Sequence, residues 1–182
     1  MKKLTIVAIV VIVLIAIAYI VYGKPVKEIS RVEILTYTSE KYGFSFKYPD
    51  SYELSEKEVG NAEREQFAIV LTPKESLPLP EAGEGPTTIS IHAYQNDLDG
   101  MRLAEWLTGT NDSNFKLSNG TYATTTVAGA PAVRYAWSGL YEAHVVAFER
   151  PGAIVAITGT YSTPTDAIVA DFEAVVQSVE LK

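Results

Sequence analysis

The residues best suited to acid–base or metal chemistry in this sequence are two histidines, His92 and His144. Imidazole changes charge near neutral pH and is a common metal ligand. Each histidine lies in a segment with strand-like alternation, residues 88–94 and 141–149, so a shared site requires these two strands to be neighbours. Histidines in a sheet are more often ordinary surface residues, and no G-x-S-x-G motif places a nucleophilic serine. A hydrolase that uses His92 or His144 is therefore the alternative interpretation, and we assign no catalytic residue.

The segment Asn96–Gly100 has the acidic composition of a calcium loop but not its spacing. Aligning Gly100 with the invariant glycine of such a loop puts Trp106 at the position that needs a bidentate glutamate. Gly129-Ala130-Pro131 is interpreted as a turn before a strand, because neither nucleotide-binding glycine motif is present. The sequence therefore predicts no metal, cofactor-binding or phosphate site.

The two tryptophans and a set of glutamates could each contribute to a binding site, but each also has a purely structural explanation. Trp106 and Trp137 could line a ligand cleft, although core packing is the simpler explanation. A set of glutamates forms an acidic neighbourhood that could attract cations or a basic partner, although a solvated loop is the default: Glu63, Glu65, Glu75, Glu81 and Glu84.

Charge and cysteine content exclude several classes of function. The chain has 182 residues, with 22 acidic and 15 basic side chains and a net charge of −7. Lys2 and Lys3 are the only charged residues before Lys24, so the rest of the chain carries −9. Such a domain lacks the positive charge that nucleic acid requires. The absence of cysteine excludes disulfides, thiol catalysis and thiolate metal sites.

Residues 4–22 are apolar or aromatic except for Thr5, and they follow two lysines. A helix of this length crosses a hydrocarbon core of ~30 Å at ~1.5 Å per residue. We predict a retained transmembrane signal-anchor, with residues 1–3 in the cytoplasm and the C-terminal domain outside the cytoplasmic membrane. The alternative is a cleaved signal peptide, but Ala16-Ile17-Ala18 lies inside the apolar run rather than after it. A linker over 23–37 and a domain over 38–182 follow, although residues 31–37 could instead form a first strand.

Alternation with a period of two predicts most of the domain to be β-structure. The clearest case is Tyr42–Tyr48, where Tyr42, Phe44, Phe46 and Tyr48 share one face. Further strands are expected over 52–58, 66–72, 88–94, 122–127, 132–138, 141–149 and 153–161. Pro151-Gly152 predicts a hairpin, with Val145, Val146, Ile154, Val155 and Ile157 at the centre of the sheet. Residues 73–87, rich in proline, glycine and glutamate, are expected to form an exposed loop.

Two helices are expected. Residues 99–107 place Leu103, Trp106 and Leu107 on one face, with Asn96, Asp97 or Asp99 as the cap. A closing helix begins with Thr163 as its cap and carries an apolar stripe: Ile168, Phe172, Val175, Val176 and Val179. The order of elements indicates an α+β fold with a largely antiparallel sheet flanked by helices.

Four segments together resemble the PsbP-like family: Tyr42–Pro49, Leu103–Leu107, Ala128–Tyr135 and Phe172–Val179. The resemblance covers residues 38–182 and implies the α/β/α sandwich that this family shares with Mog nuclear-import factors. PsbP-like proteins are typically extracytoplasmic, non-enzymatic accessory proteins that assemble on larger complexes. The photosynthetic members are associated with manganese and calcium, but no residue of this chain matches a metal motif and none is carried over.

The anchor, the lack of catalytic motifs and the resemblance lead to one functional hypothesis. The chain is expected to be a membrane-anchored extracytoplasmic binding or accessory module without enzymatic activity or cofactor. Its expected partners are the membrane, through residues 4–22, and a protein or membrane complex contacted by loop 73–87. A self-associating structural envelope protein is the third interpretation.

Overall fold

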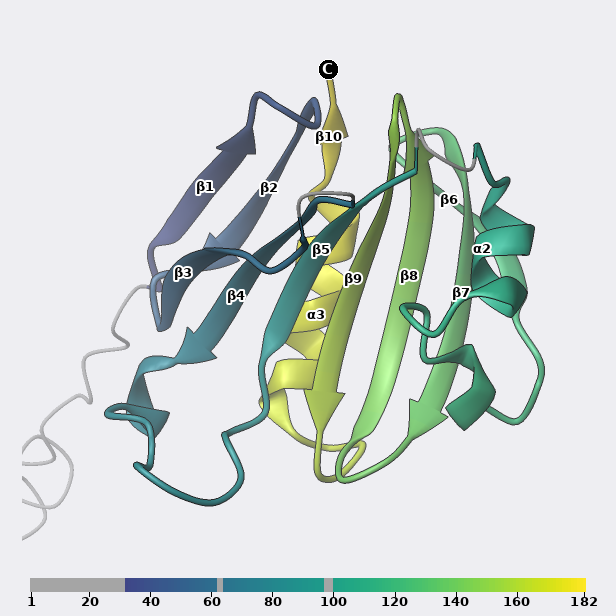
Figure 1. Ribbon diagram of the computed structural model, residues 1–182. Helices are drawn as coiled ribbons and strands as arrows, with labels where there is room; N and C mark the ends of the chain where they lie inside the picture. Colours follow the sequence, from purple (N-terminus) through teal and green to yellow (C-terminus); the bar gives the residue numbers. More distant parts are fainter. Residues whose placement is uncertain (1–31, 62–63, 97–99) are drawn as a thin grey trace, which may run out of the picture. The chain divides into compact units, whose positions relative to one another are not determined.

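A seven-stranded sheet, here called the main sheet, dominates the fold (Figure 1). The computed structural model describes residues 32–61, 64–96 and 100–182. In spatial order the strands are β3 (Tyr52–Glu58), β4 (Gln66–Pro73), β5 (Ile89–Gln95), β9 (Ala153–Tyr161), β8 (Glu142–Arg150), β7 (Ala130–Ser138) and β6 (Ala123–Val127). Every pairing between them is antiparallel, as the sequence predicts.

The chain builds the main sheet from both edges inward. Strands β3, β4 and β5 form one meander, the chain then crosses to the far edge, and β6 to β9 form a second meander that returns to β5. The pairing of β5 with β9 joins the two meanders, with Ile91 opposite Ile157. The predicted β8–β9 hairpin is confirmed, with Arg150 opposite Ala153 across the Pro151-Gly152 turn.

A separate three-stranded sheet contains the aromatic strand found in the sequence. Its strands are β1 (Ile34–Ser39), β2 (Phe44–Pro49) and β10 (Glu180–Leu181). The Arg150 guanidinium holds it to the main sheet by donating to the carbonyl oxygens of Tyr42, Gly43 and Lys182 at 3.2, 2.9 and 2.7 Å. This small sheet was not expected, because pairing between β2 and the last residues of the chain leaves no local signal.

The N-terminal boundary of the domain needs a correction. Residues 32–182 form one folded unit, and β1 pairs with β2 from Ile34 onward. The linker predicted over 23–37 therefore ends earlier, and the alternative of a first strand near 31–37 is correct. The predicted anchor at 4–22 and residues 1–3 lie outside the described residues. Within the described ranges, no helix is long and apolar enough to cross a membrane.

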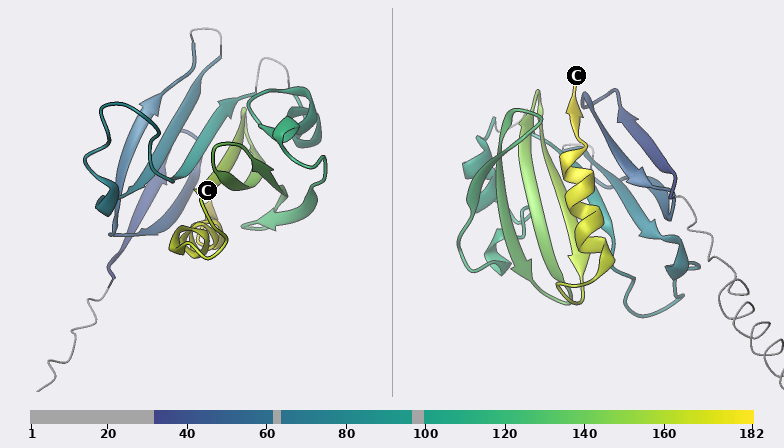
Figure 2. Two further views of the ribbon diagram at one scale, coloured as in Figure 1. Left: turned by 90° about the horizontal axis from the view of Figure 1, so that it is seen from below. Right: turned by 180° about the vertical axis from the view of Figure 1, so that it is seen from behind.

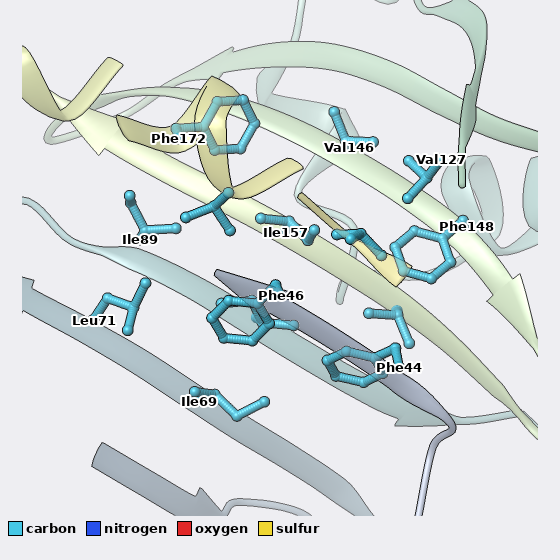
Figure 3. Close-up of a cluster of buried hydrophobic side chains, with 14 of the residues drawn as sticks. Phe44, Phe46, Ile69, Leu71, Ile89, Val127, Val146, Phe148, Ile157 and Phe172 are labelled. Carbon is cyan, nitrogen blue, oxygen red and sulfur yellow. The ribbon is translucent and has the colours of Figure 1, made fainter. Parts of the chain in front are cut away.

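The larger of two hydrophobic clusters lies between the main sheet, the small sheet and helix α3 (Ala167–Gln177). Phe44 and Phe46 of β2 face Ile69, Ile157 and Phe148 of the main sheet (Figure 3). Phe172 of α3 packs into the same cluster and is 1% exposed. The aromatic face predicted for β2 and the apolar stripe predicted for the closing helix are both confirmed.

The second cluster lies on the opposite face of the main sheet, under helix α2 (Leu103–Gly109). Leu103, Trp106 and Leu107 are buried there against Val145 and Ile154, as their spacing predicts. Figure 2 shows α2 and α3 on opposite sides of the sheet. The fold is thus mixed α+β, with helices on both faces of an antiparallel sheet.

Both helices begin differently from the sequence prediction. Helix α2 starts at Leu103, whose amide donates to the Glu149 carboxylate of β8 at 2.7 Å. Asn96 instead donates to the Met101 carbonyl at 2.6 Å, and residues 97–99 are outside the described ranges. Helix α3 starts after Asp166 rather than Thr163. The Asp166 carboxylate accepts from the amides of Ser162 and Thr163, so these residues form a turn before the helix.

We expect Gly159→Ala to destabilise the protein, because Phe172 packs directly on this glycine of β9. An added Cβ would lie 2.8 Å from Phe172 Cγ and Cδ2, closer than real Cβ contacts. Overpacking of this kind typically costs about 1–3 kcal/mol in the free energy of unfolding, which denaturant titration measures.

Gly109→Ala is the matched control for this prediction. It lies at the end of α2 with nothing within 4 Å of the added Cβ. It should change stability by no more than about 1 kcal/mol, in the stabilising direction. Equal stability of wild type and Gly159→Ala would contradict the tight contact.

Candidate functional site

The two histidines lie on opposite faces of the main sheet. Strand β9 separates β5, which carries His92, from β8, which carries His144. His144 contacts Phe172 on the α3 face, with ring centroids 6.2 Å apart. His92 stacks on Tyr94, which packs against Trp106 of α2 on the other face. The two imidazoles therefore cannot share a metal ion or a substrate, and the hypothesis of a histidine pair is wrong.

His92 lies on the face of the main sheet that α2 covers, and there it packs beneath the helix through Tyr94. Its Nδ1 accepts from Gln66 Nε2 at 2.7 Å, and its ring stacks on Tyr94 with centroids 5.7 Å apart. Burial lowers the pKa of His92, while the charge of Asp112 opposes that shift. The side chain is thus held in its neutral form by packing.

His144 belongs to a polar group on the α3 face. Its Nε2 lies 3.0 Å from the Tyr161 hydroxyl, and its buried Nδ1 has no hydrogen-bond partner among the described residues. Nearby, Arg134 and Glu173 form a bidentate ion pair at 2.8 and 2.7 Å, which lowers the pKa of Glu173. This pair ties β7 to α3. Together with the contact between His144 and Phe172, this ion pair holds α3 against the main sheet, so we interpret the group as part of the packing of the helix.

The acidic neighbourhood expected from sequence is not one neighbourhood. Glu65 precedes β4 and pairs with Lys41, whereas Glu75 follows β4. The eight residues of β4 separate them by about 25 Å of extended chain. Glu81 and Glu84 lie with Glu75 in loop 73–87, and Glu63 is outside the described residues. Glu65 and Glu75 are close in sequence but not in space, because the extended strand β4 lies between them.

The other candidates from sequence take structural roles. Trp106 is buried in the α2 cluster, and Trp137 packs at its rim. The turn before β7 is formed by Ala128 and Gly129, both with positive φ, while Ala130 and Pro131 are already in the strand. Among the described residues, no group of three or more His, Cys, Asp or Glu side chains could hold a metal ion.

An open cleft of about 570 Å³ lies at one end of the main sheet. It lies between the start of β3, the end of β4 and the first turn of α3. Its charged lining residues are Lys74, Glu75, Asp166 and Asp171. Sequence reasoning missed it, because Tyr52 and Asp171 are far apart in the chain and carry no common motif.

Hydrogen bonds fix the walls of this cleft. The Tyr52 hydroxyl donates to Asp171 Oδ2 at 2.7 Å. Burial, and then this bond to a carboxylate, raises the pKa of Tyr52, so the phenol stays protonated. Hydrogen bonds from Thr163 and Ser162 lower the pKa of Asp166, so its carboxylate stays charged. These groups can bind a cation or a hydrogen-bond donor, but they form no nucleophile–base pair.

Loop 73–87 borders the cleft and is held at several points. It contains a short 3-10 helix, Lys74–Ser76, which has no buried residue and lies within the exposed loop that the sequence predicts. The Lys74 amide donates to the Ser51 carbonyl at 2.9 Å, and the Tyr141 hydroxyl donates to the Gly85 carbonyl at 2.7 Å. We call loop 73–87 together with the β7–β8 turn, residues 139–141, the loop end of the sheet. Leu77, Leu79 and Leu140 are exposed there, at 38%, 54% and 63%.

We expect the stability of the protein to fall as pH drops below about 6.5, the unfolded pKa of histidine, in part because of His92. Since folding lowers the pKa of His92, the unfolded chain binds this proton first, and acid favours unfolding. The loss is at most about 1.4 kcal/mol per pH unit and stops below the folded pKa.

His92→Gln should therefore lose less stability than wild type between about pH 7.5 and 5.5 in denaturant titrations. Both proteins share the same carboxylates, so carboxylate titration cancels in the difference. Parallel stability curves for the two proteins would show that His92 does not contribute.

Comparison with known proteins supports the fold. No family model and no curated protein matches the chain. The solved structure of CyanoP, the cyanobacterial PsbP from Synechocystis sp. PCC 6803, is similar with a TM-score of 0.53 and 12% identity, over 87% of this chain and 98% of that one. A protein from Bacteroides thetaiotaomicron VPI-5482 gives a TM-score of 0.44 and 14% identity, over 81% of this chain and 48% of its own. At such identities the likeness to CyanoP shows the fold alone, and that fold is PsbP-like.

Proposed function

We propose that this protein is a membrane-anchored, extracytoplasmic accessory module that binds a protein partner through the loop end of its main sheet. The observation that carries the proposal is the exposure of Leu77 and Leu79 on a loop that borders the open cleft. Singly exposed leucines are common, whereas apolar side chains exposed together mark interaction surfaces, and we take Leu77 and Leu79 as the apolar part of such a surface.

The fixed shape of the loop end favours binding. A flexible loop loses conformational freedom when it binds, and this cost reduces affinity. Here the Tyr141–Gly85 and Lys74–Ser51 hydrogen bonds already restrain the loop. A partner would therefore meet a surface that is largely formed in advance.

The accessory role also agrees with the resemblance described above. The PsbP-like fold is associated with non-enzymatic proteins that assemble on larger complexes, and the titratable groups of the cleft are suited to binding rather than to nucleophilic catalysis. The predicted anchor at residues 4–22 would raise the local concentration of the domain at the membrane, which strengthens capture of a membrane partner.

We expect the full-length chain to remain in the membrane fraction after high-pH washing and to keep residues 4–22. A retained span inserts effectively irreversibly, whereas a cleaved signal leaves the domain free. Fractionation followed by intact mass measurement distinguishes the two. A mature chain that begins after Ala18 would overturn the anchor and leave the loop end to be tested separately.

We expect the double variant Leu77→Ser/Leu79→Ser to lose the partner in a crosslinked pull-down from intact membranes. The two leucines are exposed, so the substitutions leave the core and the loop backbone unchanged. Burial of one leucine side chain contributes about 1.5–3 kcal/mol, so the loss of two at the contact should weaken binding by about tenfold or more.

Leu117→Ser is the control, because Leu117 is 45% exposed but lies on a separate 3-10 helix, Phe115–Leu117. It should capture the same stoichiometric partner as wild type. Unchanged capture by the double variant would exclude the loop end as the contact, while loss of capture by both variants would point to a surface nearer Leu117.

A further inference from the structure

Strand β6 is an unprotected edge of the main sheet. It pairs with β7 on one side and with no other described strand on its outer side. An edge strand offers a row of backbone N–H and C=O groups to any strand that can approach it. The first four residues of β6, Ala123 to Thr126, are exposed, so no described element covers this edge.

The opposite edge of the same sheet is protected by charge. Strand β3 carries Glu53, Glu56, Lys57 and Glu58, and charged side chains are a standard means of preventing edge pairing. By contrast, no charged residue lies anywhere between Lys116 and Arg134. The uncharged stretch includes all of β6, the turn that follows it and the start of β7.

We propose that β6 pairs antiparallel with β6 of a second copy of this chain, joining two main sheets into one. The sequence of β6, Ala-Thr-Thr-Thr-Val, matches itself in this arrangement. With the two-fold axis at Thr125, Thr125 lies opposite Thr125, Thr124 opposite Thr126, and Ala123 opposite Val127. Threonine pairs on adjacent strands are favourable cross-strand contacts.

The same register also covers an exposed aromatic residue. Tyr122 precedes β6 and is 43% exposed, with its ring packed edge-on against Phe115. Continuing the register by one residue places Tyr122 opposite Ala128 of the other copy, at the Ala128-Gly129 turn. Pairing would therefore bury part of Tyr122 against a small residue.

Charge selects β6 over the other uncharged edge of the molecule. Strand β1, Ile34–Ser39, also lacks charges, but Glu33 and Glu40 flank it. In an antiparallel pair of two β1 strands, Glu33 of each copy would face Glu40 of the other, which is destabilising. No such like-charge pair arises within β6, because the nearest charged residues along the chain, Lys116 and Arg134, lie outside the paired segment.

Disulfide trapping in membranes that contain the full-length chain tests the proposal. Opposing residues of an antiparallel pair have Cα atoms ~4.5–5.5 Å apart, within the range that a disulfide spans. The chain has no cysteine of its own, so Thr125→Cys introduces the only thiol. Under mild oxidation this variant should form a covalent dimer.

Ser55→Cys is the matched control, since Ser55 is a small exposed residue at the middle of the charged edge strand β3. Thr125→Cys should crosslink roughly tenfold faster or more, because a held pair has an effective concentration in the millimolar range. Equal rates for the two variants would mean random collision and would overturn the proposal. A mixed disulfide between Thr125→Cys and a cysteine of another protein, formed in place of the dimer, would assign the edge to a different partner and would also overturn it.

Lysine substitution supplies an independent readout. Thr125→Lys places two positive charges opposite each other and should shift the detergent-solubilised chain from dimer to monomer in sedimentation, while Ser55→Lys should leave the mass unchanged. A cooperative thermal unfolding transition confirms that Thr125→Lys is folded. A wild-type chain that sediments as a monomer across the concentration range would also overturn the pairing.

Discussion

The pairing of β9 with β5 is the constraint on which the rest of this structure depends. The two strands are far apart in the chain, yet their contact is the only link between the meander β3–β4–β5 and the meander β6–β7–β8–β9 among the described strands. Strand β9 also supplies side chains to both faces, with Val155 and Ile157 in one cluster and Ile154 and Ala156 in the other. Loss of this pairing would open both clusters at once.

The two faces of the main sheet separate the two histidines. Because successive residues of a strand point to opposite sides, His92 and His144 end on different faces of one sheet. His92 packs against Tyr94, and His144 packs against Tyr161 and Phe172. The open cleft that holds Tyr52 and Asp171 lies away from both histidines, at one end of the sheet.

Edges and ends of the sheet have different roles. The small sheet, α2 and α3 cover the faces, and Arg150 and Glu149 at the end of β8 tie the small sheet and the start of α2 to the main sheet. Loop 73–87 and the β7–β8 turn form an exposed end, and β6 forms an exposed edge. These surfaces are separate, so binding of a partner at the loop end and pairing of two copies at β6 are compatible.

Sequence patterns were sufficient to predict most of the strands and both helices of this protein. Alternation with a period of two identified the buried aromatic face of β2 and the central residues of β8 and β9. A spacing of three and four residues identified the buried faces of α2 and α3. Both patterns depend only on neighbours along the chain, so they can be found in the sequence. Strand pairing was visible only in the tertiary structure. It shows that β2 pairs with β1 and β10 rather than with the main sheet. It also shows that the two histidines lie far from each other, as do the acidic residues before and after β4. It also decided that Glu149 rather than Asn96 holds the start of α2, and that Tyr52 and Asp171 meet at a cleft. Such contacts join residues tens of positions apart, and their energy depends on the packing of the whole domain rather than on any local pattern.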